Sequence, residues 1–122
     1  MNDRRILSDK YLSSLWSKAV RAEKGLRCVK CGTNAHSVHH IIKRRYMVLR
    51  YDPKNGVPLC TMCHPIADRN TEFAMQLIPD ADRGYLADMG MYTLKDWLQV
   101  SRQSRAEFLK GCADELKGII KG

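Results

Sequence analysis

Two pairs of cysteines have the spacing of a metal site. Each pair encloses two residues, as Cys28-Val29-Lys30-Cys31 and as Cys60-Thr61-Met62-Cys63. Two intervening residues allow both thiolates of a pair to reach one ion at about 2.3 Å, and two such pairs complete a tetrahedral zinc site. Four thiolates leave no position open for substrate, so we predict a structural zinc. The alternatives are four inert thiols or two disulfides, which need an oxidising compartment.

Four further polar residues lie between or directly after these cysteines: His39, His40, Asn55 and His64. A neutral imidazole can accept a proton from water near pH 7, because free histidine has a pKa of about 6.5. Imidazole also binds divalent metals, which can neutralise a phosphate and stabilise a leaving oxygen. These residue types could therefore supply a general base and ligands for a divalent metal. As alternatives, Asn55 with Gly56 would form only a turn, His64 would cap a helix, and one histidine of the pair would lie in the core or on the surface.

The order of these elements resembles that of the HNH endonucleases. The first cysteine pair is followed by Val38-His39-His40-Ile41-Ile42, then by Asn55-Gly56-Val57-Pro58-Leu59, the second cysteine pair and His64. The resemblance covers about residues 10–75 and is greatest to the small stand-alone members of phages, prophages and mobile elements. It implies a ββα-metal (His-Me finger) core, one catalytic divalent ion, and cleavage of DNA that leaves 5′-phosphate and 3′-hydroxyl ends.

The resemblance also implies a role for each polar residue. His40 occupies the position of the general base, and His39 and His64 occupy positions of metal ligands. Asn55 matches the central asparagine, which either ligates the metal or holds the base loop in place. The metal would be Mg²⁺, Mn²⁺ or another divalent transition metal. Adjacent residues of an ideal strand point to opposite faces, so His39 and His40 can share a site only if the strand twists or ends there.

The positive charge is concentrated in the first part of the chain. The formal net charge is +8, and residues 1–50 hold 12 Lys or Arg against 3 Asp or Glu. A basic half beside a nearly neutral half suggests that one face binds a polyanion. Lys43, Arg44, Arg45 and Arg50 are the candidates for contact with DNA phosphates, although a solvated basic loop is the simpler alternative. His36 is interpreted as a loop residue or a phosphate contact.

The remaining pattern indicates one α+β domain over residues 1–122, with helical extensions at both ends. We expect a helix at 9–24 with Trp16 in the core, a zinc and ββα core at about 26–78, and a helical extension at about 93–120. Within the core, strands are predicted at 38–42 and 57–59, and a helix at 66–78 with a break near Asn70. Residues 79–92 are predicted to be loop, and Ser104-Arg105-Ala106-Glu107 has a capping-box pattern. The fifth cysteine, Cys112, is expected to be a buried helix residue.

These expectations favour a DNA endonuclease, with DNA as the partner. No apolar run approaches the roughly 20 residues of a membrane helix, and no targeting segment is evident, so a cytoplasmic protein without a membrane partner is expected. The alternative is a non-catalytic, zinc-stabilised module that binds DNA or protein. A homodimer, or a subunit that needs a phage partner protein to select its site, is also compatible with the sequence.

Overall fold

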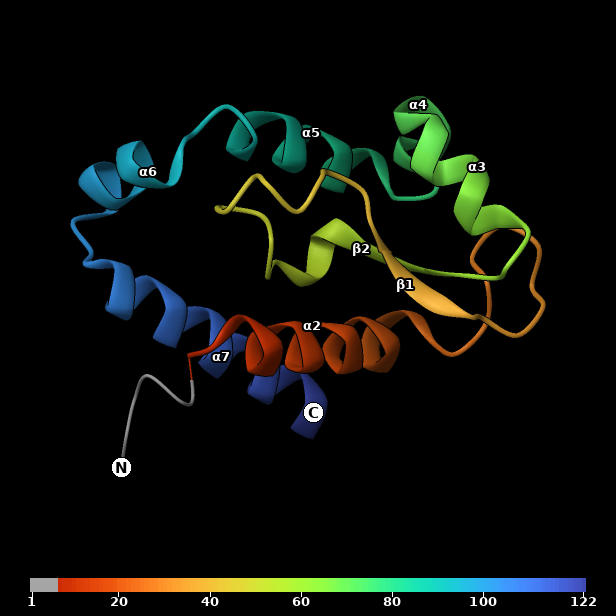
Figure 1. Ribbon diagram of the computed structural model, residues 1–122, viewed down its shortest axis with the longest axis horizontal. Helices are drawn as coiled ribbons and strands as arrows, with labels where there is room; N and C mark the ends of the chain where they lie inside the picture. Colours follow the sequence, from red (N-terminus) through yellow and green to blue (C-terminus); the bar gives the residue numbers. More distant parts are fainter. Residues whose placement is uncertain (1–6) are drawn as a thin grey trace.

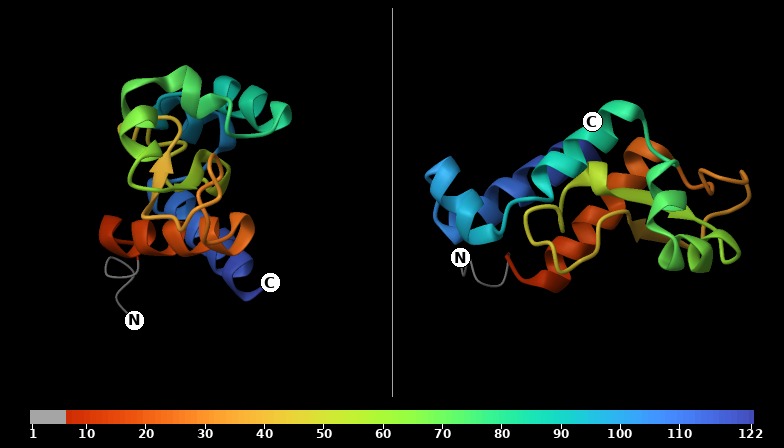
Figure 2. Two further views of the ribbon diagram at one scale, coloured as in Figure 1. Left: turned by 90° about the vertical axis from the view of Figure 1, so that its right-hand side faces the viewer. Right: turned by 90° about the horizontal axis from the view of Figure 1, so that it is seen from above.

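The computed structural model describes residues 7–122, so residues 1–6 of the predicted domain lie outside the described part. The elements follow the order α2 (Asp9–Lys24), β1 (Ser37–His40), η1 (Pro53–Asn55), β2 (Gly56–Leu59), α3 (Cys63–Arg69), α4 (Thr71–Met75), α5 (Asp80–Met89), α6 (Leu94–Ser101) and α7 (Arg105–Lys121). The small sheet lies between a layer that contains α2 and α7 and a layer that contains α3, α4 and α5 (Figure 1). The side view in Figure 2 shows the same three layers. No helix within residues 7–122 is both long enough and apolar enough to cross a membrane.

The predicted first helix is present as α2. The Ser8 side chain accepts a hydrogen bond from the backbone N–H of Tyr11 and caps the helix, which ends at Gly25. Its apolar stripe is buried, as the spacing predicted: Leu12, Trp16, Ala19 and Val20. These residues form a hydrophobic cluster with Tyr51 and with Ala113 and Leu116 of α7, so the two terminal helices pack on each other.

The two strands and the following helix form a ββα unit, which confirms the predicted α+β fold class. β1 pairs with β2 in antiparallel register, with Val38 opposite Pro58 and His40 opposite Gly56. β1 is shorter than predicted and ends at His40. Pro58 is tolerated because a two-stranded sheet has only edge strands, and its carbonyl accepts a hydrogen bond from the N–H of Val29.

The prediction of a loop over residues 79–92 was wrong, because α5 occupies most of it. Pro79 and two glycines suggested irregular structure, yet Pro79 directly precedes the first turn, where a missing N–H costs nothing. Gly84 lies in the helix interior, at a cost of about 1 kcal/mol relative to Ala. Leu86 is fully buried in the main core, and the Tyr85 hydroxyl donates to Asp52. Burial of this face outweighs the local cost.

Helices α4, α6 and α7 each begin at a side-chain cap, and the capping box at α7 was predicted. The break near Asn70 is present, and the Asn70 side chain accepts from the Phe73 N–H to begin α4. Thr93 caps α6, and Ser104 with Glu107 forms a reciprocal capping box at the start of α7. Cys112 lies on α7 and is half-buried.

Candidate active site and metal centres

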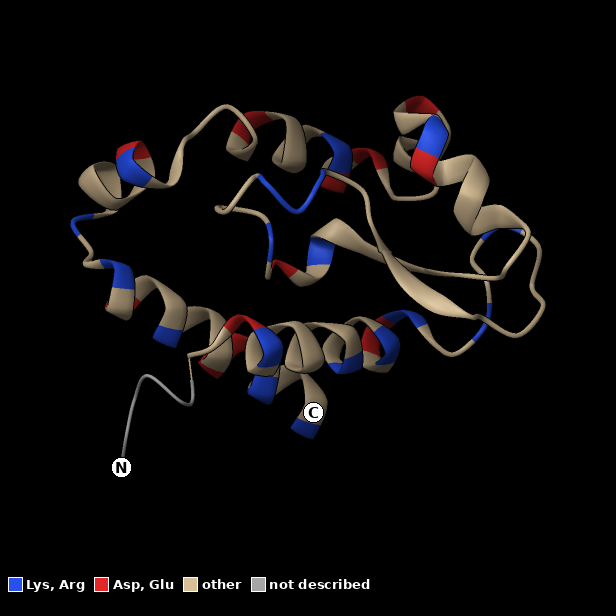
Figure 3. Ribbon diagram, in the orientation of Figure 1, with Lys and Arg blue, Asp and Glu red and all other residues tan. Residues whose placement is uncertain are grey.

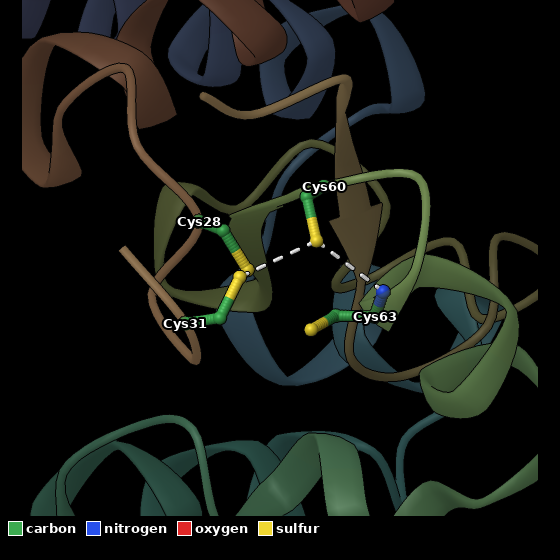
Figure 4. A group of neighbouring side chains, drawn as sticks. All are labelled: Cys28, Cys31, Cys60 and Cys63. Atoms are coloured by element: carbon green, nitrogen blue, oxygen red, sulfur yellow. Dashed lines mark hydrogen bonds between the residues drawn. The ribbon is translucent and has the colours of Figure 1, made fainter. Parts of the chain in front are cut away.

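The four cysteines of the two pairs converge on one point. The side chains of Cys28 and Cys31 come from the loop after α2, Cys60 follows β2, and Cys63 begins α3 (Figure 4). Their sulfur atoms all lie within 4.8 Å of one another, and the Cys31 and Cys60 sulfurs are 3.5 Å apart. A tetrahedral zinc with bonds of about 2.3 Å needs sulfurs about 3.8 Å apart. The donor set therefore fits one zinc ion, which these residues are able to hold.

The backbone of the first pair forms a tight knuckle around this point. The Gly32 N–H donates to the Cys28 carbonyl, and Gly32 has φ of 80°, a conformation in which a side chain would be strained. At the second pair, the Cys63 N–H donates to the Cys60 sulfur over 3.4 Å. That backbone hydrogen bond lowers the pKa of Cys60 to about 6 and favours the thiolate that a metal needs.

A second ligand group lies beside the sheet and consists of two predicted residues and one that was not predicted. His39, His64 and Asp68 each place a ligand atom within 4.8 Å of the other two. His39 Nδ1 is 3.2 Å and His64 Nε2 is 3.5 Å from Asp68 Oδ1. Two imidazoles and a carboxylate suit divalent ions from Mn²⁺ to Zn²⁺, so this donor set fits a divalent metal.

Ser37 fixes the orientation of the His64 ring. The Ser37 hydroxyl is hydrogen-bonded to His64 Nδ1, and His64 Nε2 faces Asp68. When Nδ1 donates to the hydroxyl, Nε2 carries the lone pair that a metal requires. His39 is buried, and burial lowers its pKa, which favours the neutral imidazole, the form that is able to bind a metal.

His40 points away from this group and packs on α2. Its ring is stacked on the Trp16 indole, with centroids 3.8 Å apart and planes 8° from parallel. Its Nε2 lies 3.0 Å from the Arg50 carbonyl oxygen, which can only accept, so Nε2 carries the proton and Nδ1 is left as a proton acceptor. Burial lowers the pKa of His40 to about 4, and the imidazole is therefore neutral near pH 7.

The two adjacent histidines nevertheless open onto one cavity. The strand periodicity is obeyed, since His39 faces α3 and His40 faces α2, and β1 ends at His40. A cavity of about 620 Å³ lies at the end of β1. Its lining includes the rings of His39 and His40 together with His64 and Asp68. A reactant in the cavity would thus contact the group of His39, His64 and Asp68 and the His40 imidazole together.

Asn55 is fully buried and holds the loop that follows β1. Its Oδ1 accepts from the Ile42 N–H over 2.6 Å, and its Nδ2 donates to the carbonyls of Ile42 and Leu49, each over 3.0 Å. Both polar atoms of the amide are therefore engaged by backbone groups. This loop includes Arg50, whose carbonyl bonds His40.

Replacing Asn55 with Ala should reduce the free energy of unfolding by about 2–5 kcal/mol, because each buried backbone group left unpaired costs about 1–3 kcal/mol. Urea unfolding followed by circular dichroism measures the change. Asn70→Ala is the matched control, since it removes an exposed helix cap and should cost only about 1 kcal/mol. Equal losses for the two variants would show that the Asn55 hydrogen bonds do not hold the loop.

The four predicted DNA-contact residues differ in their surroundings. Lys43 and Arg44 are exposed and line the cavity, whereas Arg45 is exposed outside it and lies over the Tyr46 ring. The Arg50 side chain is only 20% exposed and pairs with Asp9 over 2.8 Å, so it is turned inward. His36 is exposed and lies outside the cavity lining.

Residues that the sequence interpretation missed also line this cavity. Asp68 follows His64 by four residues on α3, a spacing that places both on one helix face and that is visible in the sequence. Arg21 adds a positive charge from α2, three residues beyond Lys18 on the polar side of the predicted helix. Trp16 was assigned to the core, where it is 3% exposed, but its contact with His40 has no local sequence signal.

Comparison with known protein families agrees with this geometry. Residues 27–67 match the family model described as HNH endonuclease. No curated protein and no solved structure matches the chain significantly. The matched segment contains both cysteine pairs, β1, β2 and the residues His39, His40, Asn55 and His64, while α2 and Asp68 lie outside it. Over residues 27–67, which carry the ββα unit and both cysteine pairs, the chain is thus similar to the HNH endonucleases.

Proposed function

We propose that this protein is a metal-dependent DNA endonuclease that hydrolyses phosphodiester bonds. One observation carries the proposal: the His40 imidazole and the group of His39, His64 and Asp68 face the same cavity from opposite sides of the end of β1. The cysteine site lies apart from this cavity, and we assign to it a structural zinc.

In the proposed reaction, His40 acts as the general base. Its Nδ1 accepts a proton from a water molecule, whose oxygen forms a bond to phosphorus as the bond from phosphorus to the 3′ oxygen breaks. The leaving oxygen takes a proton from solvent, and the products carry a 5′-phosphate and a 3′-hydroxyl. The Arg50 carbonyl accepts from Nε2 and thereby keeps the tautomer in which Nδ1 is the acceptor. His39, His64 and Asp68 would hold a divalent ion, which would supply Lewis-acid stabilisation of the phosphate and the leaving oxygen.

Asn55 is assigned to the base loop and not to the metal. Its three hydrogen bonds engage the carbonyl oxygen and the amide nitrogen, and the side chain is fully buried and outside the cavity lining. Asp68 takes the third ligand position in its place, and its negative charge offsets part of the charge of a divalent ion.

Plasmid cleavage tests the proposed function. Purified protein should convert supercoiled DNA to nicked or linear DNA when Mg²⁺ or Mn²⁺ is added, and should not do so without a divalent ion. Protein that carries its zinc, binds DNA and never cuts with any divalent ion would instead be a non-catalytic zinc module.

Replacing Asp68 with Asn should raise the Mn²⁺ concentration for half-maximal nicking by at least about tenfold, because the only anionic ligand is lost. Part of the activity should return at saturating Mn²⁺. Asp114→Asn is the control, since this carboxylate lies on α7, where its near neighbour is Lys110. An unchanged metal requirement in Asp68→Asn would remove Asp68 from the ligand set.

The positive residues around the cavity form the proposed DNA path. Arg21 reaches it from α2, and Lys43 and Arg44 reach it from the loop after β1; Figure 3 shows Lys and Arg on both elements. Arg44 lies 3.6 Å from Asp9, but both side chains are about half exposed, so this pair is weak and leaves the guanidinium available. Arg50 is left out of the path because Asp9 holds its side chain inward.

Replacing Arg21 and Lys43 together with Ala should weaken DNA binding for all sequences. The slope of log affinity against log salt concentration should become shallower by roughly one to two units, since each phosphate contact contributes about 0.9. Fluorescence anisotropy with a labelled duplex over a range of salt concentrations measures both quantities.

The control variant removes two exposed lysines from other faces, Lys95 on α6 and Lys121 at the end of α7. Both double variants lower the net charge by two, so only a local contact separates them. Equal salt slopes for the two would place the DNA elsewhere.

A further inference from the structure

Helix α2 lies outside the segment that matches the HNH family, yet it supplies the surface on which the proposed base rests. Trp16 and His40 are parallel to within 8°, with centroids 3.8 Å apart. One face of the imidazole is therefore covered by the indole, and both residues line the cavity.

Two further contacts hold the indole in place. Its Nε1 donates to the Asp52 carbonyl over 2.8 Å, and the side chain is only 3% exposed. On a further side lies Gly56, where an added Cβ would come within 2.5 Å of the indole ring. The position of the indole is thus fixed by its neighbours. β2 approaches the indole so closely that only glycine fits at position 56, opposite His40.

The first turn of α2 fixes the other contact of His40. Asp9 accepts a hydrogen bond from the Tyr51 hydroxyl over 2.6 Å and forms an ion pair with the Arg50 side chain over 2.8 Å. The carbonyl of Arg50 is the acceptor for His40 Nε2. Two residues of α2, seven positions apart, thus act on the face and on the edge of the same ring.

We propose that Trp16 is a positioning residue for the general base, and that its stack holds the His40 imidazole in the orientation that aims Nδ1 into the cavity. This inference rests on the proposed nuclease function. An imidazole with one free face can rotate about its Cβ–Cγ bond, whose torsional preference is broad. The indole restricts this rotation, and misplacement of a reacting group by about 1 Å can cost about 10²-fold in rate.

The test compares variants that keep or remove an aromatic ring at position 16. Trp16→Phe loses the indole N–H but retains a ring for stacking, whereas Trp16→Leu and Trp16→Met fill much of the space without one. Leu12→Val is the control, because Leu12 is fully buried in the same helix and belongs to the cluster that packs α2 on α7. Thermal unfolding and zinc content establish that each variant is folded at the assay temperature.

Two readouts separate positioning from packing. The nicking kcat should fall about 10²-fold in Trp16→Leu and Trp16→Met, with KM for DNA unchanged, while Trp16→Phe and Leu12→Val stay close to wild type. The ring protons of His40, assigned by their absence in His40→Ala, should lie upfield in the wild-type NMR spectrum. They should move downfield when the ring at position 16 is removed.

The possible results distinguish a failure of the positioning role of Trp16 from a failure of the proposed nuclease function. Wild-type kcat in Trp16→Leu, or an equal loss in Trp16→Phe and Trp16→Leu, would overturn the positioning role, because the ring would then not matter. A wild-type protein that never nicks DNA would overturn the proposed function and with it any catalytic role of Trp16. The NMR shift would still report whether the indole orders the imidazole, so the two failures are distinguishable.

Discussion

Replacing His40 with Ala should lower the nicking rate by about 10²- to 10⁴-fold, the usual contribution of a general base. The loss is expected because Nδ1 of His40 is the proton acceptor of a neutral ring that opens onto the cavity. Zinc content and DNA affinity should remain as in wild type, since His40 belongs to neither ligand group and carries no charge near pH 7. Initial rates on supercoiled plasmid, at saturating Mn²⁺, measure the effect.

A matched control uses another histidine of the same half of the chain. His36→Ala should cut like wild type, because His36 is exposed and outside the cavity lining. The stack on Trp16 adds a stability control: loss of the imidazole exposes the indole, so unfolding should be measured for both variants. Undiminished cutting by His40→Ala would show that the base is misassigned, and His39 would be the next candidate.

The convergence of the four cysteines could be predicted, because the spacing of a cysteine pair is set by the chemistry of metal binding. A C-x-x-C pair reaches one ion whatever surrounds it, and the capping residues Ser8 and Ser104 act on backbone groups three residues away. Asp68 has a comparable local signal, since its spacing from His64 places both side chains on one helix face, and this signal was overlooked.

The contacts of the His40 ring and of Asn55 could not be predicted, because they join distant residues. Trp16 and His40 are 24 positions apart, and Asn55 bonds a backbone group 13 residues away. Because this contact joins distant residues, the sequence alone left open whether Asn55 ligates the metal or holds the loop after β1. Arg50 was assigned to DNA from its charge alone, whereas its partner, Asp9, belongs to α2. Likewise, the burial of Leu86 that stabilises α5 depends on the tertiary core and not on local propensity.

Replacing Cys60 with Ser should abolish tight zinc binding and unfold the ββα core. The sulfurs of Cys28, Cys60 and Cys63 are part of the main hydrophobic cluster, together with Leu59 and Ala67, so the metal site and the core form one unit. Structural zinc contributes on the order of 10 kcal/mol of apparent binding free energy in small modules, which is comparable to the whole stability of a domain. Loss of one of four ligands should therefore remove most of the folding free energy.

Zinc content of the purified protein and far-ultraviolet circular dichroism measure this effect. Wild type should carry about one tightly held zinc per chain and should lose its structure when a strong chelator removes the metal. Cys112→Ser is the control, because Cys112 lies on α7, away from the four-cysteine group, and its thiol should be dispensable for zinc. The helices α2 and α7 pack in a separate cluster, so partial helical signal in Cys60→Ser is compatible with loss of the ββα core. Wild type that is folded without zinc, or Cys60→Ser that keeps both zinc and the wild-type spectrum, would contradict the assignment of these cysteines to a structural metal.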